Sequence, residues 1–348
     1  MLAMTATGPA VAAEPSAAGN MPSASLIDCA GWGARVPSAP VRIWDRRPVK
    51  ILVHHTATPN VADLSRAAAE SLARGIQEFH MARRGWIDTG QHLTISRGGF
   101  VLEGRHRTLE VLAHGRRQVE GAHCSRQNTV SIGIENEGTY LDVDPPPELW
   151  NRLRETCAHL CARYGIAPTA IYGHRDFKNT TCPGDRLYGL LPQLRAEVGG
   201  LLGRRVEGAA ARPASWPLLR EGDTGDLVLA AQYLLRAVGF TDLTPTGVFD
   251  AGTGRAVRVL QAAHTVEEVN SLLGAESWPV LVTSADRAGG ADVERAVRLL
   301  AAARRTEAAG VPLSPTAGPL TLPAWQRLLG TAGAAVDPSA DPPGLLPR

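Results

Sequence analysis

Two short apolar runs that each lead into a histidine constrain the fold of this chain more than any other feature. Residues 51–53 are typical of a buried strand, and His54 follows them directly. A second apolar run, 170–172, is followed closely by His174. Strand-like and helix-like segments alternate around these runs. This alternation predicts an α/β domain built on a central sheet.

The predicted elements of this domain fall between residues 50 and 202. Strands are predicted at 50–54, 92–96, 100–103, 130–136 and 169–173, and helices at 63–83, 147–164 and 186–202. Apolar residues recur at helical spacing through 147–164, and a run of three prolines, 145–147, marks the start of that helix.

His54, His174 and Cys182 form a candidate metal-ligand set. Cys182 comes eight residues after His174 and is followed by Pro183 and Gly184. Two imidazoles and a thiolate suit Zn²⁺, and three protein ligands leave a fourth position open for water, as in catalytic zinc sites. Because the chain has ten histidines, either histidine taken singly is more often an ordinary core or surface residue. The surrounding motifs therefore decide the interpretation.

Four motifs carry a family resemblance: ILVHHTAT, GWIDTGQHLTISRGGFVLEGR, GAHCSRQNTVSIGIENEGTY and GHRDFKNTTCPGD. In this order they resemble the family of peptidoglycan recognition proteins and type 2 N-acetylmuramoyl-L-alanine amidases, over residues 27 to 200. The resemblance implies a zinc amidase fold with a central mixed sheet flanked by helices. It also implies peptidoglycan as substrate, and it places the first zinc ligand at His54 rather than at His55.

The resemblance assigns catalytic roles to two further residues. Glu135 ends an apolar strand at the position of the family's catalytic carboxylate, where it can shuttle protons to the leaving amine. Glu137 is a competitor, because period two puts it on the same strand face. Thr180 occupies a place where phage members carry Lys and some amidases carry Thr, and its hydroxyl can donate a hydrogen bond to the oxyanion.

Five residues are predicted to contact the substrate, namely Gln91, His92, His123, Arg126 and Asn128. Gln91 departs from the family pattern, since many relatives have Tyr at this position. His123 matches a histidine of the family's substrate cleft. Arg126 suits bidentate capture of a carboxylate, although a solvent-facing loop charge is an equally frequent role for such a residue.

The rest of the chain predicts a second domain. Residues 203–215 are a polar Gly/Ala/Pro linker. Beyond it, 216–330 resemble a small helical peptidoglycan-binding module, with 285–330 as a degenerate half repeat or a plain helical hairpin. We expect this module to tether the enzyme to its polymer, so that cutting the chain near Arg204 leaves hydrolysis of small soluble muropeptides nearly intact. Residues 1–26 are predicted to be disordered or a remnant export signal, and 331–348 a disordered tail.

Composition narrows the remaining possibilities. A net charge of +2 gives no case for nucleic-acid binding, and no apolar run approaches the 18 residues of a membrane span. With Cys182 assigned to the metal, four cysteines remain, Cys29, Cys124, Cys157 and Cys161, which could form two disulfides or serve as buried apolar residues. We expect a secreted or wall-associated monomer. The two functions kept open are a zinc amidase and a non-catalytic recognition protein, and the presence of Cys182 favours the amidase.

Overall fold

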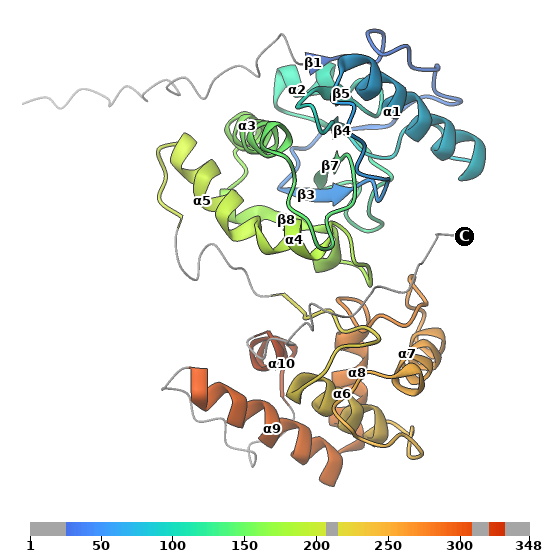
Figure 1. The fold of residues 1–348 in the computed structure, drawn as a ribbon, viewed down its shortest axis with the longest axis vertical. Helices are drawn as coiled ribbons and strands as arrows, with labels where there is room; N and C mark the ends of the chain where they lie inside the picture. Colours follow the sequence, from blue (N-terminus) through green and yellow to red (C-terminus); the bar gives the residue numbers. More distant parts are fainter. Residues whose placement is uncertain (1–25, 207–214, 308–319, 331–348) are drawn as a thin grey trace, which may run out of the picture.

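The computed structural model of the chain describes residues 26–206, 215–307 and 320–330. They form a mixed α/β domain, followed by a helical region that lies beside it (Figure 1). This arrangement confirms the predicted fold class. The predicted terminal segments and most of the predicted linker lie outside the described residues, so the domain boundaries stay a prediction.

The α/β domain is built on a six-stranded mixed sheet. Its strand order is β1-β5-β4-β7-β3-β8, and β5 pairs with β4 antiparallel whereas all other neighbours are parallel. The strands are β1 (Leu26–Ile27), β3 (Lys50–His55), β4 (Leu93–Ile95), β5 (Val101–Glu103), β7 (Ser131–Asn136) and β8 (Ile171–Gly173). A separate two-stranded ribbon pairs β2 (Ile43–Trp44) with β6 (Gln118–Val119).

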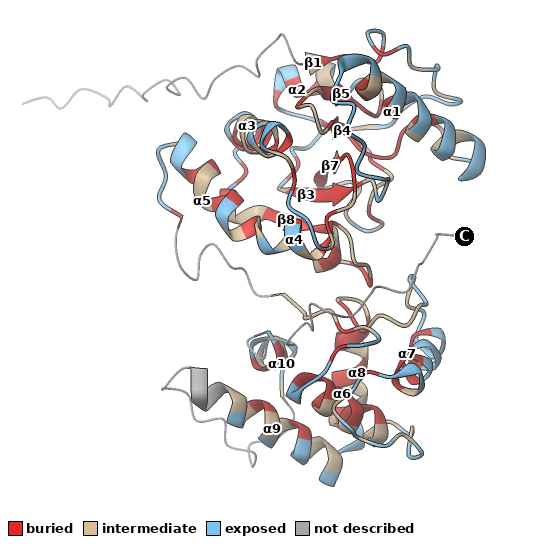
Figure 2. Cartoon of the chain, viewed as in Figure 1, coloured by how far each residue is buried: buried red, intermediate tan, exposed pale blue. Residues whose placement is uncertain are grey.

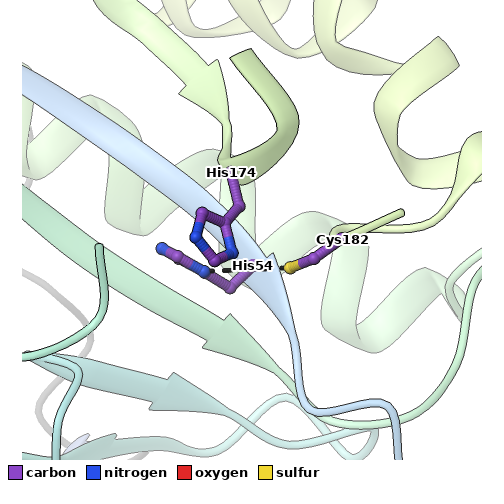
Figure 3. A group of neighbouring side chains, drawn as sticks. All are labelled: His54, His174 and Cys182. Carbon is purple, nitrogen blue, oxygen red and sulfur yellow. Dashed lines mark hydrogen bonds between the residues drawn. The ribbon is translucent and has the colours of Figure 1, made fainter. Parts of the chain in front are cut away.

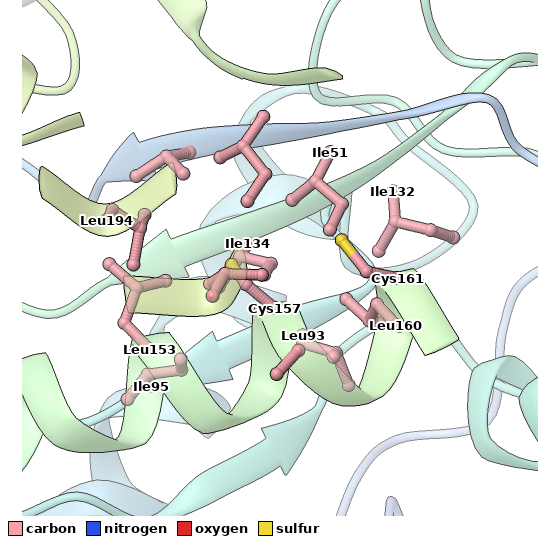
Figure 4. Close-up of a cluster of buried hydrophobic side chains, with 14 of the residues drawn as sticks. Ile51, Leu93, Ile95, Ile132, Ile134, Leu153, Cys157, Leu160, Cys161 and Leu194 are labelled. Carbon is pink, nitrogen blue, oxygen red and sulfur yellow. The ribbon is translucent and has the colours of Figure 1, made fainter. Parts of the chain in front are cut away.

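Helices cover both faces of the sheet. On one face, α3 (Pro147–Tyr164) and α5 (Leu191–Leu201) bury alternate side chains of β3, β4 and β7 in the main core (Figure 4). Against the other face, α1 (Arg66–Glu78) packs beside β5 in a smaller core that includes Trp32. The side chains of each strand alternate between these two layers. A strand that packs one face in the main core therefore presents its other face to the opposite layer, which is where the site lies.

The structure differs from the predicted elements mainly at helix ends. The predicted helix 63–83 is α1 followed by a π-helical segment, η2 (Phe79–Arg83). The predicted helix 186–202 is divided into α4 (Asp185–Gly189) and α5, because Pro192 has no N–H to continue the ladder from α4. Two short 3₁₀ segments, η3 (Pro168–Ala170) and η4 (His174–Asp176), flank β8, and α2 (Thr108–His114) was not predicted.

The helical region contains five helices among the described residues. They are α6 (Asp226–Ala237), α7 (Ala251–Ala263), α8 (Ser277–Ala288), α9 (Ala291–Glu307) and α10 (Leu322–Leu329). Their buried faces meet in one core that includes Trp278 and Trp325 (Figure 2). Helix α9 packs on α6, and α10 packs on α8 and α9. None of the helices in the described part of the chain is long and apolar enough to cross a bilayer.

Candidate active site and metal centre

The alternation of side chains along β3 separates the core from the site. Ile51 and Val53 pack in the main core with α3 and α5. Leu52 and His54 therefore project from the opposite face of the sheet. His55 shares the parity of Val53, and its Nδ1 atom accepts a weak hydrogen bond from the backbone N–H of Tyr140 in the core layer. This geometry agrees with His54, rather than His55, as the residue presented to the site.

His54, His174 and Cys182 converge at the carboxyl ends of β3 and β8 (Figure 3). One ligand atom from each of the three lies within 4.8 Å of the other two. The Nδ1 atom of His54 is 3.8 Å from Sγ of Cys182. Two donors bonded tetrahedrally to one zinc ion would be about 3.6 Å apart, given usual Zn–N and Zn–S lengths. The spacing of these atoms therefore fits a single zinc ion.

The electrostatics of the three residues also fit a metal. Burial lowers the pKa of His174 to about 3 and holds the pKa of His54 well below its ordinary value. Both rings are therefore neutral and have a lone pair to give. Burial raises the pKa of the Cys182 thiol well above its ordinary value. A metal must displace the thiol proton to bind, which is the ordinary requirement for a thiolate ligand.

His123 holds His54 from the side away from Cys182. Its Nδ1 atom is 3.0 Å from Nε2 of His54, and its Nε2 atom is 3.5 Å from the hydroxyl of Ser131. A neutral His54 that offers Nδ1 to a metal carries its proton on Nε2, and this proton points at His123. The ring of His123 lies over Gly133, where any Cβ would come within 2.5 Å of it. A glycine is therefore required on this face of β7.

Glu135 lies next to His54 across the β3–β7 pairing. Its carboxylate borders the site, yet its Oε2 atom is enclosed and has no hydrogen-bond partner among the described residues. Burial raises the pKa of Glu135 to about 8. Glu137, the competitor, is not among the residues that line this site, and its carboxylate accepts a hydrogen bond of 2.7 Å from the backbone N–H of Arg97.

A pocket of about 260 Å³ opens over these residues. Besides the three ligands and Glu135, it is lined by His55, Ala57, His80, Trp86, Gly90, Gln91, Ala122, His123, Thr180 and Thr181. Sequence reasoning missed His80 and Trp86, whose rings stack at 4.6 Å. Trp86 belongs to a motif that carries the family resemblance, so its position offered a signal, whereas His80 lies within η2, where no sequence pattern distinguishes it.

The predicted substrate contacts divide into two groups. Gln91 and His123 line the pocket, and Gln91 donates to the hydroxyl of Thr94 while its Oε1 atom has no partner among the described residues. His92 is fully buried, with Nε2 on the carbonyl of Val119 and Nδ1 on the N–H of Gly133. Its two ring nitrogens have no capacity left for a substrate. His92 is not among the residues that line the pocket, and its role as a substrate contact stays a prediction.

Arg126 and Asn128 also lie away from the pocket lining. The side-chain oxygen of Asn128 accepts hydrogen bonds of 2.9 Å from the backbone N–H groups of His123 and Cys124. Asn128 therefore shapes the loop that presents His123. Arg126 is exposed and forms an ion pair of 3.3 Å with Glu267 of the helical region.

The four other cysteines form no disulfide; all five thiols in the chain are free. Cys157 and Cys161 belong to α3 and are fully buried in the main core (Figure 4). The sequence left open whether this pair forms a disulfide or serves as buried apolar residues. The structure shows buried apolar residues.

Matches to known protein families cover the α/β domain and the helical region separately. Residues 44–185 match the family model of N-acetylmuramoyl-L-alanine amidases, and residues 224–281 match that of a putative peptidoglycan-binding domain. The chain is 32% identical over 173 residues to peptidoglycan recognition protein 1 of Bos taurus, across 49% of this chain and 83% of that protein. It belongs to the family of peptidoglycan recognition proteins and N-acetylmuramoyl-L-alanine amidases.

Other relatives include both an amidase and a further peptidoglycan recognition protein. An N-acetylmuramoyl-L-alanine amidase of Sus scrofa is 30% identical over 191 residues, across 52% of this chain and 29% of that protein. The solved structure of Drosophila PGRP-LB is 29% identical, with a TM-score of 0.42, across 48% of this chain and 91% of that one. Family membership places this chain among proteins that hydrolyse or recognise peptidoglycan.

Proposed function

We propose that this chain is a zinc-dependent N-acetylmuramoyl-L-alanine amidase. It would hydrolyse the amide that joins the lactyl group of N-acetylmuramic acid to the L-alanine of the stem peptide. The observation that carries the proposal is the convergence of His54, His174 and Cys182 in an open pocket beside the carboxylate of Glu135. Three ligands and an adjacent acid–base group are what catalytic, rather than structural, zinc sites contain.

The three ligand residues would hold the metal, with the proton of His54 directed at His123. When bound, zinc would supply Lewis-acid polarisation of the scissile carbonyl and activation of water. No further His, Cys, Asp or Glu joins this group in the described residues, which supports a site with an open coordination position.

The chain's own residues supply the proton transfers and the substrate contacts. Glu135, whose side chain lines the pocket beside the three ligand residues, would accept a proton from the attacking water and deliver it to the leaving amine. The hydroxyl of Thr180 lies at the pocket wall and would donate a hydrogen bond to the oxyanion. Gln91, at the position where many relatives carry Tyr, would orient the substrate amide.

The alternative is a recognition protein that binds peptidoglycan without cleaving it. The complete ligand set favours the enzyme, because members without catalysis typically lack the cysteine. The family's substrate also favours a secreted or wall-associated location, with the module at 216–330 holding the enzyme on its polymer. We propose that the chain acts as a monomer.

A direct test is the zinc content of the purified chain beside two cysteine variants. We expect one zinc per chain in the native protein and in the Cys124→Ala variant, since Cys124 is buried but lies outside the ligand set. The Cys182→Ala variant should lose most zinc and activity. Full zinc and full activity in Cys182→Ala would contradict the assignment.

A further inference from the structure

The segment between two of the three zinc ligands is bound by the helical module. Residues 177–181, here called the ligand loop, connect His174 to Cys182 and carry Thr180. The ligand loop lies against residues 267–277 of the module, through polar contacts from Lys178 and Asn179. Neither of these two residues lines the pocket, and both are buried.

Asn179 fits a slot that the module builds for it. Its side-chain N–H₂ donates to the hydroxyl of Ser277 at 2.8 Å and to the carbonyl of Glu268 at 3.3 Å. Its side-chain oxygen accepts from the backbone N–H of Glu276 at 3.1 Å, and its carbonyl accepts from the amide of Asn270 at 2.8 Å. The hydrogen-bonding groups of the Asn179 side chain are thus satisfied almost entirely by the module.

The slot is fixed from within the module. Buried Gln261 donates to the hydroxyl of Ser277 at 2.9 Å and accepts from the backbone N–H of Asn270 at 2.7 Å. Gly274 lies so close to Asn179 that a Cβ there would come within 3.1 Å of its Oδ1 atom. The module surface is therefore preorganised to receive the ligand loop.

Charges reinforce the contact. Lys178, with a side chain only 5% exposed, pairs with Glu276 at 3.1 Å and also with Glu267. Glu267 further accepts from Ser125 and pairs with Arg126, in the loop that presents His123. One carboxylate of the module thus joins the ligand loop to the loop that presents His123.

A second contact holds the far end of the same segment. Asp185, just beyond Cys182, pairs with Arg175 at 2.7 Å and with Arg220 of the module at 2.5 Å. Arg175 also donates to the carbonyl of Thr181. The stretch from 175 to 185 is therefore held by the module on both sides of Thr180 and Cys182.

We propose that the module supports the active site from outside the pocket lining, with Lys178 and Asn179 as positioning residues that fix Thr180 and Cys182. The proposal rests on the proposed zinc amidase function, and it gives the module a role besides tethering. It differs from the prediction made from sequence that hydrolysis of small soluble substrates does not depend on the module.

The test uses point variants of the full chain. A Glu267→Gln/Glu276→Gln double variant keeps side-chain shape but removes both charges from Lys178. Asn179→Ala, a second and independent variant, empties the slot. Glu294→Gln is the matched control, since Glu294 pairs with Arg298 at the exposed surface of α9. Lys178→Arg, compared with Lys178→Met, asks whether a conservative cation restores the contact.

Two readouts need no substrate, so they separate this proposal from the amidase assignment. We expect amide hydrogen exchange at residues 178–182 to accelerate in the double variant and in Asn179→Ala. Competition with a chelator should show that each of these variants binds zinc about 10-fold more weakly than the native chain. Glu294→Gln and Lys178→Arg should match the native chain in both readouts. With small muropeptides, kcat should fall in the disrupted variants while thermal unfolding of the module is unchanged.

The proposal is overturned if both disrupted variants keep native exchange at 178–182 and native zinc affinity. It is also overturned if Lys178→Met and Lys178→Arg behave alike. A lack of hydrolysis by the native chain would sink the amidase assignment, while the exchange and zinc measurements would still decide the role of the module.

Discussion

The Nε2 atom of His54 lies 3.0 Å from the Nδ1 atom of His123, on the side of the ring away from Cys182. His123 is therefore a partner of a proposed metal ligand as well as a residue of the pocket wall. The sequence indicated only the second role. A histidine ligand that donates its other ring N–H to a fixed acceptor has its tautomer and orientation set by that acceptor.

We expect His123→Ala to weaken zinc binding by about 10- to 100-fold, the usual effect of losing such a partner. His123→Asn is the matched variant, because the amide oxygen of Asn can stand near the position of Nδ1. Competition with a chelator measures both affinities. If His123→Ala binds zinc as the native chain does and changes only KM, His123 is a substrate contact alone.

Glu135 and Glu137 provide a second pair of matched variants. Glu135→Gln should keep zinc and fold but lower turnover by about 10²- to 10⁴-fold, because the general acid–base is lost. Glu137→Gln should retain most turnover, since that carboxylate is occupied by the backbone of Arg97. Steady-state hydrolysis of a soluble muropeptide measures both. The reverse outcome would move the catalytic role two residues along β7.

Zinc binding should depend on pH through Cys182. Because burial holds the pKa of the thiol above its ordinary value, the metal-free residue is protonated at neutral pH. Binding must release that proton, so apparent affinity should rise about tenfold per pH unit between roughly pH 6.5 and 8. Titration calorimetry in buffers of different ionisation enthalpy counts the released protons. A pH-independent affinity without proton release would show that the thiolate is not a ligand.

Buried neutral histidines should make the fold sensitive to acid. Burial lowers the pKa of His80 and of His92 to about 4, whereas both take up protons near pH 6.5 in the unfolded chain. The unfolded state therefore binds more protons between these values, and stability falls as pH falls from about 6.5 to 4. Each histidine contributes about 1.4 kcal/mol per pH unit. Denaturant unfolding across this range measures the slope, and a flat profile would contradict the expected burial.

The sequence predicted most of the sheet and the three residues that converge at its edge, for physical reasons that differ from residue to residue. Long strands such as β3 and β7 show continuous apolar runs, and α3 shows helical spacing with prolines at its start. The two-residue strands β1, β2 and β6 are too short for any periodicity to appear. The division of 186–202 at Pro192 could have been anticipated from the missing N–H.

Around the site, the hydrogen-bond partners of several side chains follow from tertiary contacts, which the sequence does not reveal. His92 and Asn128 stand in motifs of the family, but their polar atoms are satisfied by backbone groups. The contacts of Lys178 with Glu276 and of Asn179 with Ser277 each join residues 98 positions apart, and no local pattern indicates them. Residue type and spacing suggest candidate metal ligands because metal chemistry is selective, whereas positioning contacts depend on the folded arrangement.

The measurement that tests the central claim most directly is product analysis after incubation of purified peptidoglycan with the zinc-loaded chain. We predict new amino-terminal L-alanine on released stem peptides and an equal amount of N-acetylmuramic acid with a free lactyl carboxylate. Both products should disappear with a zinc chelator, return on adding zinc, and be absent with Cys182→Ala. Binding of the zinc-loaded chain to peptidoglycan without either product would contradict the amidase assignment and support a recognition protein.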